Sequence, residues 1–499
     1  MYKLLLSVFF TLSCTLISAQ TFDVGTLNDI HNREKQLKGK WDPQQSVMIR
    51  SLALMEDSTT ARASFRKPII NILPISLITQ YNSRHPYGGN DGSLIPAKGL
   101  QSRFSTGIQL KAGFIEAQFA PEVVGAVNQA YQVTPDFGYN NGKSFQRIYS
   151  GQSTIQLTQS GFKAGVSTAN QWWGPGVRNS LLMSYQAPGF VHFFVGSKRP
   201  QSIGIGHLEW KMTGGWLEAD GDRSMEHRHL RSADPMMSSR KRYVNAVTVS
   251  YQPKWVPGLF VGLSRVIQTY TSDSLVNSLG SFERYFPVLA LGGQKKNLTN
   301  EDQFARDQVA SFFLRWVLKE HQLEFYTEYG YNDYKTNIRD YIGGVTHSAA
   351  HIVGIQKRID GPGANRYITL NMELTKVSQS PDWLVRSAGN WYEHDQIKEG
   401  YTNDNQIMGS VYGFGADAVF VGINFVKEEN RLSFFYEQIV RDPIGRTLRW
   451  VDRSIGAQRQ IKKGKWLLSG KLQMILSSNY TWRDGSPMQI QAGFGITRF

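Results

Sequence analysis

Apolar and polar residues alternate at every second position along most of this chain. In the segment RYITLNMELTKV (366–377), isoleucine, leucine and methionine fill the even positions from 368 to 374, while threonine, asparagine and glutamate fill the odd ones from 369 to 375. Because side chains along a strand point alternately to opposite faces, this pattern predicts a strand with one apolar and one polar face. A helix would instead place Glu373 beside Leu370 and lose the separation.

The same alternation places carboxylates on one face of other segments. In residues 322–329, apolar or aromatic side chains at 323, 325 and 329 alternate with polar ones at 322, 324 and 328. A carboxylate that faces lipid is costly. We therefore expect the polar faces to point into the interior of a transmembrane barrel, with Glu324, Glu328 and Glu373 facing the lumen.

Short turns and long polar connections also alternate along residues 68–499, which we interpret as the barrel. If the first strand, at 69–82, starts from the periplasmic side, every short turn falls on that side and every long connection on the outer side, as is typical of outer-membrane barrels. Counting hairpins gives about 20 candidate strands. The short turns lie at 111–113, 159–161, 319–321 and 427–431, and the long connections at 83–99, 121–147, 222–241, 271–306 and 379–409.

Residues 1–19 have the three parts of a secretory signal peptide. Lys3 supplies the positive charge, residues 4–12 the apolar stretch, and Ile17-Ser18-Ala19 a cleavage site. The apolar stretch is too short to cross a bilayer as a helix, which takes roughly 20 residues. The single cysteine, Cys14, lies within this signal, so we expect a mature chain without thiols or disulfides.

Residues 20–67 differ from the alternating part of the chain. The stretch 29–40 is charged, and the stretch 46–55 (SVMIRSLALM) has apolar residues at mixed helical spacing. We interpret this segment as a short helical region on the periplasmic side that precedes the barrel or plugs that end of it. A leader without structure is the alternative.

Composition argues against a large soluble α/β enzyme. Aromatic residues make up 12% of the chain and the mean hydropathy is -0.34, whereas the buried parallel strands of such an enzyme need long apolar runs. The formal net charge of +15 is scattered along the chain. A scattered charge favours a solvated surface or an anionic glycan partner over a nucleic acid.

Three loops are richer in glycine, asparagine, tryptophan and tyrosine than simple linkers need: 82–92, 170–176 and the region 391–410. Tryptophan and tyrosine offer flat apolar faces to sugar rings, amides and carboxylates bind hydroxyl groups, and arginine holds a uronate carboxylate. Turn formation and packing of the loops over the lumen are the alternative for each residue. The candidate glycan contacts are Arg84, Tyr87, Asn90, Asp91, Trp172, Trp173, Arg178, Tyr392, His394 and Tyr401.

Catalytic and metal-binding patterns are weak in this sequence. Glu393, His394 and Asp395 are adjacent, but three consecutive side chains rarely point at one centre, and neither Ser184 nor Ser410 lies in a nucleophile elbow. The ten histidines have no metal-like spacing. We therefore expect no catalytic residues, no metal site and no cofactor.

The three loops carry a resemblance to a known family. The strings PYGGNDG (86–92) and QWWGPG (171–176), with YEH (392–394) followed by GYTN (400–403), resemble the Wzi family of capsule-assembly outer-membrane proteins. The resemblance runs in order from about residue 68 to the C-terminus. It implies an 18-stranded barrel with a periplasmic helical segment and a role in attaching capsular polysaccharide at the cell surface.

The sequence therefore predicts a non-enzymatic, exported outer-membrane β-barrel that binds and organises capsular or other surface polysaccharide. Its expected partners are outer-membrane lipid and that polysaccharide, and we expect a monomer. One alternative is a porin, in which Glu324, Glu328 and Glu373 line an open pore. The other is a barrel enzyme acting on lipid or surface glycan, in which His394 takes part.

Overall fold

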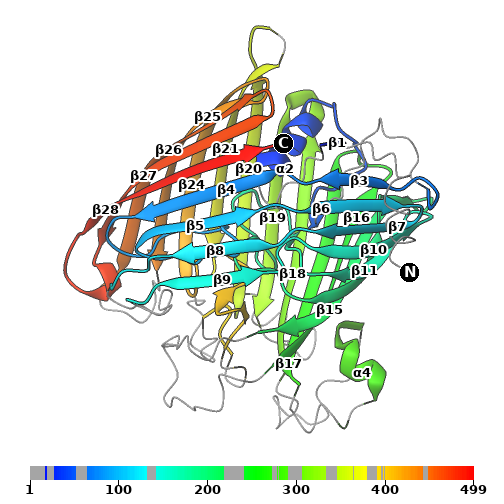
Figure 1. Ribbon diagram of the computed structural model, residues 1–499, viewed down its shortest axis with the longest axis horizontal. Helices are drawn as coiled ribbons and strands as arrows, with labels where there is room; N and C mark the ends of the chain where they lie inside the picture. The colour runs from blue at the N-terminus through cyan, green and yellow to red at the C-terminus, as the bar shows by residue number, and fades with distance from the viewer. Residues whose placement is uncertain are drawn as a thin grey trace, which may run out of the picture.

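A single large antiparallel sheet dominates the molecule (Figure 1). The computed structural model describes residues 17–18, 27–51, 64–131, 142–218, 241–271, 278, 280–289, 306–332, 346–363, 365–378, 390–394, 397, 399–441 and 448–499. The strands that form the wall are β3 (Ile69–Ile72), β4 (Ile75–Asn82), β5 (Gly99–Ser105), β6 (Ile108–Ala112), β7 (Ile115–Phe119), β8 (Glu122–Ala126), β9 (Phe145–Tyr149), β10 (Thr154–Gln159), β11 (Phe162–Ser167), β13 (His192–Ser197), β14 (Gln201–Ser202), β15 (Gly206–Leu217), β16 (Arg242–Pro253), β17 (Leu259–Tyr270), β18 (Arg306–Leu318), β19 (Leu323–Asn332), β20 (Ala349–Asp360), β21 (Arg366–Lys376), β24 (Ala416–Lys427), β25 (Asn430–Arg441), β26 (Trp450–Lys463), β27 (Trp466–Ser478) and β28 (Met488–Arg498).

The sheet closes on itself, because the last strand, β28, pairs with β4 near the start of the wall. β28 is antiparallel to β4, with Arg498 opposite Ile75 and Gln491 opposite Asn82. From β15 to β28 each wall strand pairs with the next along the chain. The structure is therefore an antiparallel β-barrel, as the alternation predicted.

Several strands near the N-terminus are interrupted in the middle. β3 pairs with β6 while its continuation β4 pairs with β5, and β7/β8 and β9/β10 are divided in the same way. Pro74 and Pro121 lie at two of these breaks, where a residue without an N–H removes a ladder hydrogen bond. When β3/β4, β5/β6, β7/β8, β9/β10 and β13/β14 are each counted as one strand and the two-residue β1 (Ile17–Ser18) is set aside, the 24 strands found in the described residues become 18 around the ring.

One sequence expectation about strand boundaries is wrong. The connection expected at 121–147 contains β8 and β9 at its two ends. Residues 181–190 turn into the barrel and pack there, and a strand begins only at His192. Hydrophobic residues that pack against an internal loop give the same local pattern as a short strand.

The outside of the wall is apolar. On β21, Leu370, Met372 and Leu374 have exposed fractions of 42%, 40% and 39%, whereas Thr369 and Glu373 on the opposite face are buried. Lipid removes the exterior residues from water, and the interior ones contact other parts of the chain. The predicted two-faced strand at 366–377 is thereby confirmed.

The two ends of the barrel differ. The short turns lie at the end that also holds α2 (Leu27–Leu37), since Lys38 just after this helix forms an ion pair with Asp360 at the end of β20. The long connections, including α4 (Ser281–Tyr285) and the short helix η2 (Pro287–Leu289), lie at the other end. Figure 1 draws α2 at the upper end and α4 at the lower end. In outer-membrane barrels the end with the short turns is usually the periplasmic one, so we expect α2 on that side.

Little of the N-terminal 26 residues is described. Ile17–Ser18 (β1) pairs in parallel with β3, and the rest of the expected signal peptide lies outside the described residues. In the part of the chain that the structure describes, no helix is long and apolar enough to cross a membrane.

Candidate functional site

Helix α2 is anchored inside the short-turn end of the barrel by a buried network of charges. Arg33 donates from Nη2 to Glu324 Oε1 on β19 at 2.6 Å, and Arg315 on β18 donates from Nε to Glu324 Oε2 at 2.7 Å. All three side chains are fully buried. Arg33 also donates to the carbonyl of Pro175 in the loop that enters from the opposite end. One helix residue thus joins the wall to an outer loop.

Glu34, the next residue of α2, contacts a second part of the wall. Its carboxylate accepts hydrogen bonds from Arg431 Nη2 at 2.5 Å and from the Tyr367 hydroxyl at 2.8 Å. Burial by itself raises the pKa of Glu34, but the Arg431 guanidinium and the hydrogen bonds outweigh it and lower the pKa to about 2. Glu34 is therefore charged at neutral pH and holds α2 to β21 and β25.

The residues after α2 form a small sheet with an outer loop. β2 (Ile49–Ser51) pairs antiparallel with β12 (Gln171–Trp173), which belongs to the connection between β11 and β13. The Arg50 guanidinium lies 4.5 Å from the centre of the Trp172 ring and donates to the Gly176 carbonyl at 2.7 Å. The expectation of helix across 46–55 is thus wrong for residues 49–51, because pairing with β12 draws them into an extended conformation.

The loop 168–191, which we call the inward loop, is fixed to carboxylates of the wall. Glu373 accepts hydrogen bonds from the backbone N–H groups of Val177 and Arg178 at 2.7 and 3.1 Å. Glu328 accepts one from the N–H of Leu181 at 3.2 Å. The structure therefore places Glu324, Glu328 and Glu373 on the interior face, where they bind the plug formed by α2, β2 and the inward loop.

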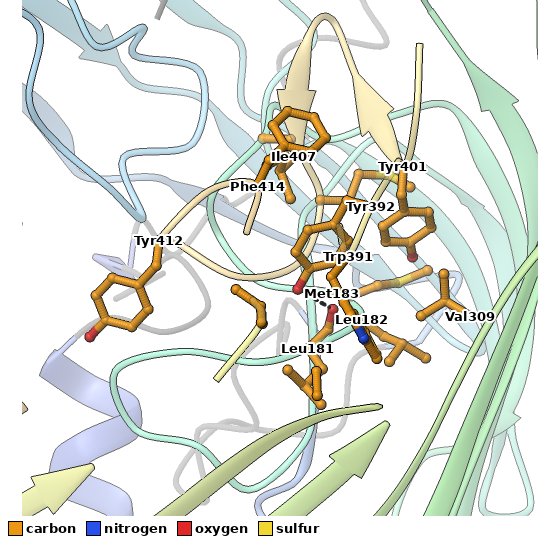
Figure 2. Close-up of a cluster of buried hydrophobic side chains, with 14 of the residues drawn as sticks. Leu181, Leu182, Met183, Val309, Trp391, Tyr392, Tyr401, Ile407, Tyr412 and Phe414 are labelled. Atoms are coloured by element: carbon orange, nitrogen blue, oxygen red, sulfur yellow. Dashed lines mark hydrogen bonds between the residues drawn. The ribbon is translucent and has the colours of Figure 1, made fainter. Parts of the chain in front are cut away.

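A second outer loop, 390–415, packs on the inward loop. Figure 2 shows the Tyr392 hydroxyl directed at Leu181, to whose carbonyl it donates at 2.9 Å. The same hydroxyl accepts the N–H of Ser410 at 2.8 Å. Tyr392 and Tyr401 are stacked, with ring centres 6.0 Å apart, and both are fully buried. Tyr392 has a φ of 73°, a left-handed conformation that costs a non-glycine residue free energy and that these contacts maintain.

The loop 83–98 completes the cluster of outer loops. The Tyr87 carbonyl accepts hydrogen bonds from Asn82 and Gln491, both at 2.8 Å. Asp91 accepts the N–H of Gly89 at 2.8 Å, and Asn90 donates to the Arg178 carbonyl at 2.8 Å. The string PYGGNDG is therefore a folded turn that touches the inward loop.

The structure brings most of the predicted glycan contacts together, but as interior residues. Trp172, Trp173, Tyr392 and Tyr401 have no exposed surface, so in this conformation no sugar ring can stack on them. Arg178 is held by Glu437, with Nε 2.9 Å from Oε1. Of the ten candidates, only Arg84 is exposed to solvent. The wedge-like packing of Trp172 and Trp173, the alternative considered from the sequence, fits their positions better.

The residues considered for catalysis have structural partners. The Ser184 hydroxyl donates to the Gly409 carbonyl at 2.5 Å. Half-buried His394 accepts the N–H of Ile397 at Nδ1, at 3.1 Å, and Asp395 lies outside the described residues. Within the described ranges, no three or more histidine, cysteine, aspartate or glutamate side chains are grouped so that they could hold a metal ion.

The sequence did not identify the arginines through which the plug and the wall are joined. Arg33, Arg50, Arg315 and Arg431 are all buried and join carboxylates or carbonyls of distant segments. The sequence did contain a signal for these arginines. Helix α2 overlaps the charged stretch 29–40, and Arg315 lies on the same strand face as Asp307 and Ser311. Local patterns do not show which distant carboxylate each arginine meets.

The fold and the plug define a class of protein: a transmembrane β-barrel of the outer-membrane type whose lumen is occupied from both ends. The profile of the family described as capsule assembly protein Wzi matches residues 79–499. This chain therefore belongs to the Wzi capsule-assembly family.

Solved structures agree with the fold. Wzi of Escherichia coli, described as an outer-membrane protein involved in group 1 capsule assembly and a carbohydrate-binding β-barrel, is 12% identical with a TM-score of 0.57; the match covers 85% of this chain and 83% of that one. Two other solved structures are less similar. OccK7 of Pseudomonas aeruginosa is 8% identical with a TM-score of 0.40, and the match covers 85% of this chain and 98% of that one. OccAB3 of Acinetobacter baumannii is 10% identical with a TM-score of 0.42, and the match covers 86% of this chain and 98% of that one. No curated protein sequence matches significantly.

Proposed function

We propose that this protein binds capsular or other surface polysaccharide at the outer face of the outer membrane and so attaches or organises it there, without catalysis. The observation that carries the proposal is membership of the capsule-assembly family over residues 79–499. The carbohydrate binding described for the E. coli relative supports the same conclusion. Its partners are the surrounding lipid and the polysaccharide. It uses no cofactor, and the barrel acts as a monomer.

The interior contacts favour this function over a porin. A diffusion pore needs a continuous aqueous path with its charged side chains facing water. Here the carboxylates expected to line such a path are bound by α2 and the inward loop, as in the pairs Arg33–Glu324 and Val177–Glu373. The lumen therefore serves as a support for the outer loops.

The buried aromatic residues act by holding that support rigid. Trp172 and Tyr392 fix the inward loop and the loop 390–415 to each other and to β2. A rigid surface loses little conformational entropy on binding. Several weak contacts between outer loops and a repeating polymer then give firm retention, because each further contact is intramolecular.

The proposal is tested by deletion of the gene in its encapsulated host. Cell-bound and released polysaccharide are measured separately, with a strain complemented by the wild-type gene as control. We expect normal total polysaccharide, of which most is released into the medium. An unchanged cell-bound layer, or a loss of total polysaccharide without release, contradicts attachment as the function.

A further inference from the structure

A groove of about 630 Å³ lies at the outer end of the barrel. One side is formed by Arg84 and His85, which follow β4, and by Lys98, which precedes β5. The other side is formed by the connection between β27 and β28, from Tyr480 to Met488. Its volume is within the range of about 300–1,000 Å³ that is usual for ligand sites.

Aromatic rings form one wall of the groove. The His85 ring is stacked on Tyr480, with centres 4.2 Å apart and an interplanar angle of 26°. Trp450 packs edge-on against Tyr480 at 4.9 Å and against Trp482 at 5.2 Å. Trp450 is itself fixed, since its indole N–H donates to Asp452 at 2.7 Å. The wall is therefore held in place before any ligand arrives.

The charge of the groove is positive. Arg84, Lys98 and Arg483 line it against a single carboxylate, Asp484. Arg84 and Arg483 are exposed. Among the described residues, no carboxylate lies within ion-pair distance of either guanidinium. Both arginines can thus take a carboxylate from outside in a two-pronged contact.

His85 offers a buried acceptor in the same groove. Its Nδ1 lies 3.2 Å from the carbonyl oxygen of Pro86. Because a carbonyl only accepts, Nδ1 carries the proton of the neutral ring, which leaves Nε2 as an acceptor. His85 is 3% exposed, and Nε2 has no hydrogen-bond partner in the described part of the chain. Burial lowers the pKa of His85 to about 4, so the ring is neutral at physiological pH.

These features together match one kind of ligand. We propose that the groove binds a carboxylate-bearing sugar unit, such as a uronic acid, of the polysaccharide. Arg84 and Arg483 hold its carboxylate, and the sugar ring packs beside Tyr480, whose own ring is held by His85. This inference rests on the proposed function and adds to it the class of sugar and the place where it binds.

The test measures binding of the purified full-length barrel in detergent to immobilised alginate, a polyuronate, and to immobilised dextran, a neutral glucan. The variant Arg84→Gln/Arg483→Gln removes both charges from exposed positions. The matched control, Arg66→Gln/Arg199→Gln, removes two exposed arginines at the periplasmic end. We expect wild type and control to bind alginate more tightly than dextran, and the groove variant to bind alginate roughly tenfold or more weakly. Added salt should weaken the alginate binding of wild type, because exposed charges are screened.

Each other outcome overturns a defined part of the proposal. Equal alginate binding by the groove variant and wild type overturns the site. Competition by inorganic phosphate as strong as that by free glucuronate overturns the carboxylate assignment in favour of phosphate groups, such as those of neighbouring lipid. Binding to the host polysaccharide but not to alginate overturns the acidic-sugar class and leaves the proposed function standing. Binding to neither, with a deletion strain that keeps its polysaccharide, overturns both.

Discussion

At the scale of single residues, the molecule depends on polar side chains buried inside a wall that is apolar outside. Tyr392 is an example, because its one hydroxyl donates to the Leu181 carbonyl and accepts the Ser410 N–H. Buried backbone groups that lose their partners cost about 1–3 kcal/mol. Tyr392→Phe should therefore destabilise the folded barrel by about that amount and lower its melting temperature in detergent. Tyr436→Phe is the control, since the hydroxyl of exposed Tyr436 donates, among the described residues, only to Gln438, two positions along the same strand. Equal melting temperatures for the two variants would contradict a stabilising role for the Tyr392 hydroxyl.

The facing direction of single residues could be predicted from the sequence, but their partners could not. Alternation placed Glu324, Glu328 and Glu373 on the polar face of their strands, because side-chain direction along a strand is a local property. Glu324 binds Arg33, 291 positions away in the chain. Such a contact depends on how the plug enters the barrel, which no local pattern records. For the same reason Trp172 and Tyr392 were expected at the surface and are found inside.

At the scale of elements, α2 is held in the barrel by a few charged contacts. Glu34→Gln would leave the Arg431 guanidinium, which is 6% exposed, without its carboxylate. Breaking a buried pair in this way costs about 3–5 kcal/mol. We expect the segment 27–51 to be cleaved by added protease at least tenfold faster in this variant, as followed by mass spectrometry. Glu320→Gln, an exposed glutamate in the turn after β18, should leave the rate unchanged.

Acid should have the same effect on α2 as this substitution. The pKa of Glu34 in the folded protein, about 2, is below its ordinary value of 4.5. The carboxylate thus contributes its full stabilisation above pH 4.5 and loses it as the pH falls from there towards 2. Protease cleavage of wild type should accelerate through this window, measured with an acid-stable protease. An equally steep acceleration in Glu34→Gln would show that another group is responsible.

At the scale of the whole molecule, alternation and turn length were sufficient to predict the barrel and the gathering of its short turns at one end. Both signals repeat along some 430 residues (68–499), so errors at single strands, such as those near 121–147, leave the architecture unchanged. The entry of the inward loop into the lumen could not be predicted, because loops that enter a barrel have the same composition as loops that leave it. The polysaccharide-binding and porin hypotheses are therefore distinguished by the plug and not by the sequence.

The plug predicts that the purified protein does not conduct. In planar bilayers, wild type should give no steady open-channel current, because α2 and the inward loop occupy the described interior. An empty-detergent sample and an open porin are the negative and positive controls. A stable conductance with the step size of an open porin would contradict a filled lumen and revive the porin hypothesis.

The central claim is tested most directly by the affinity of the purified barrel for the polysaccharide of its own host. The polymer is isolated from the medium of the deletion strain and immobilised, and wild-type protein is titrated over it, with an unrelated outer-membrane porin in the same detergent as reference. We predict saturable binding to the immobilised polymer, which added free polymer abolishes by competition. Binding no greater than that of the reference porin would contradict it.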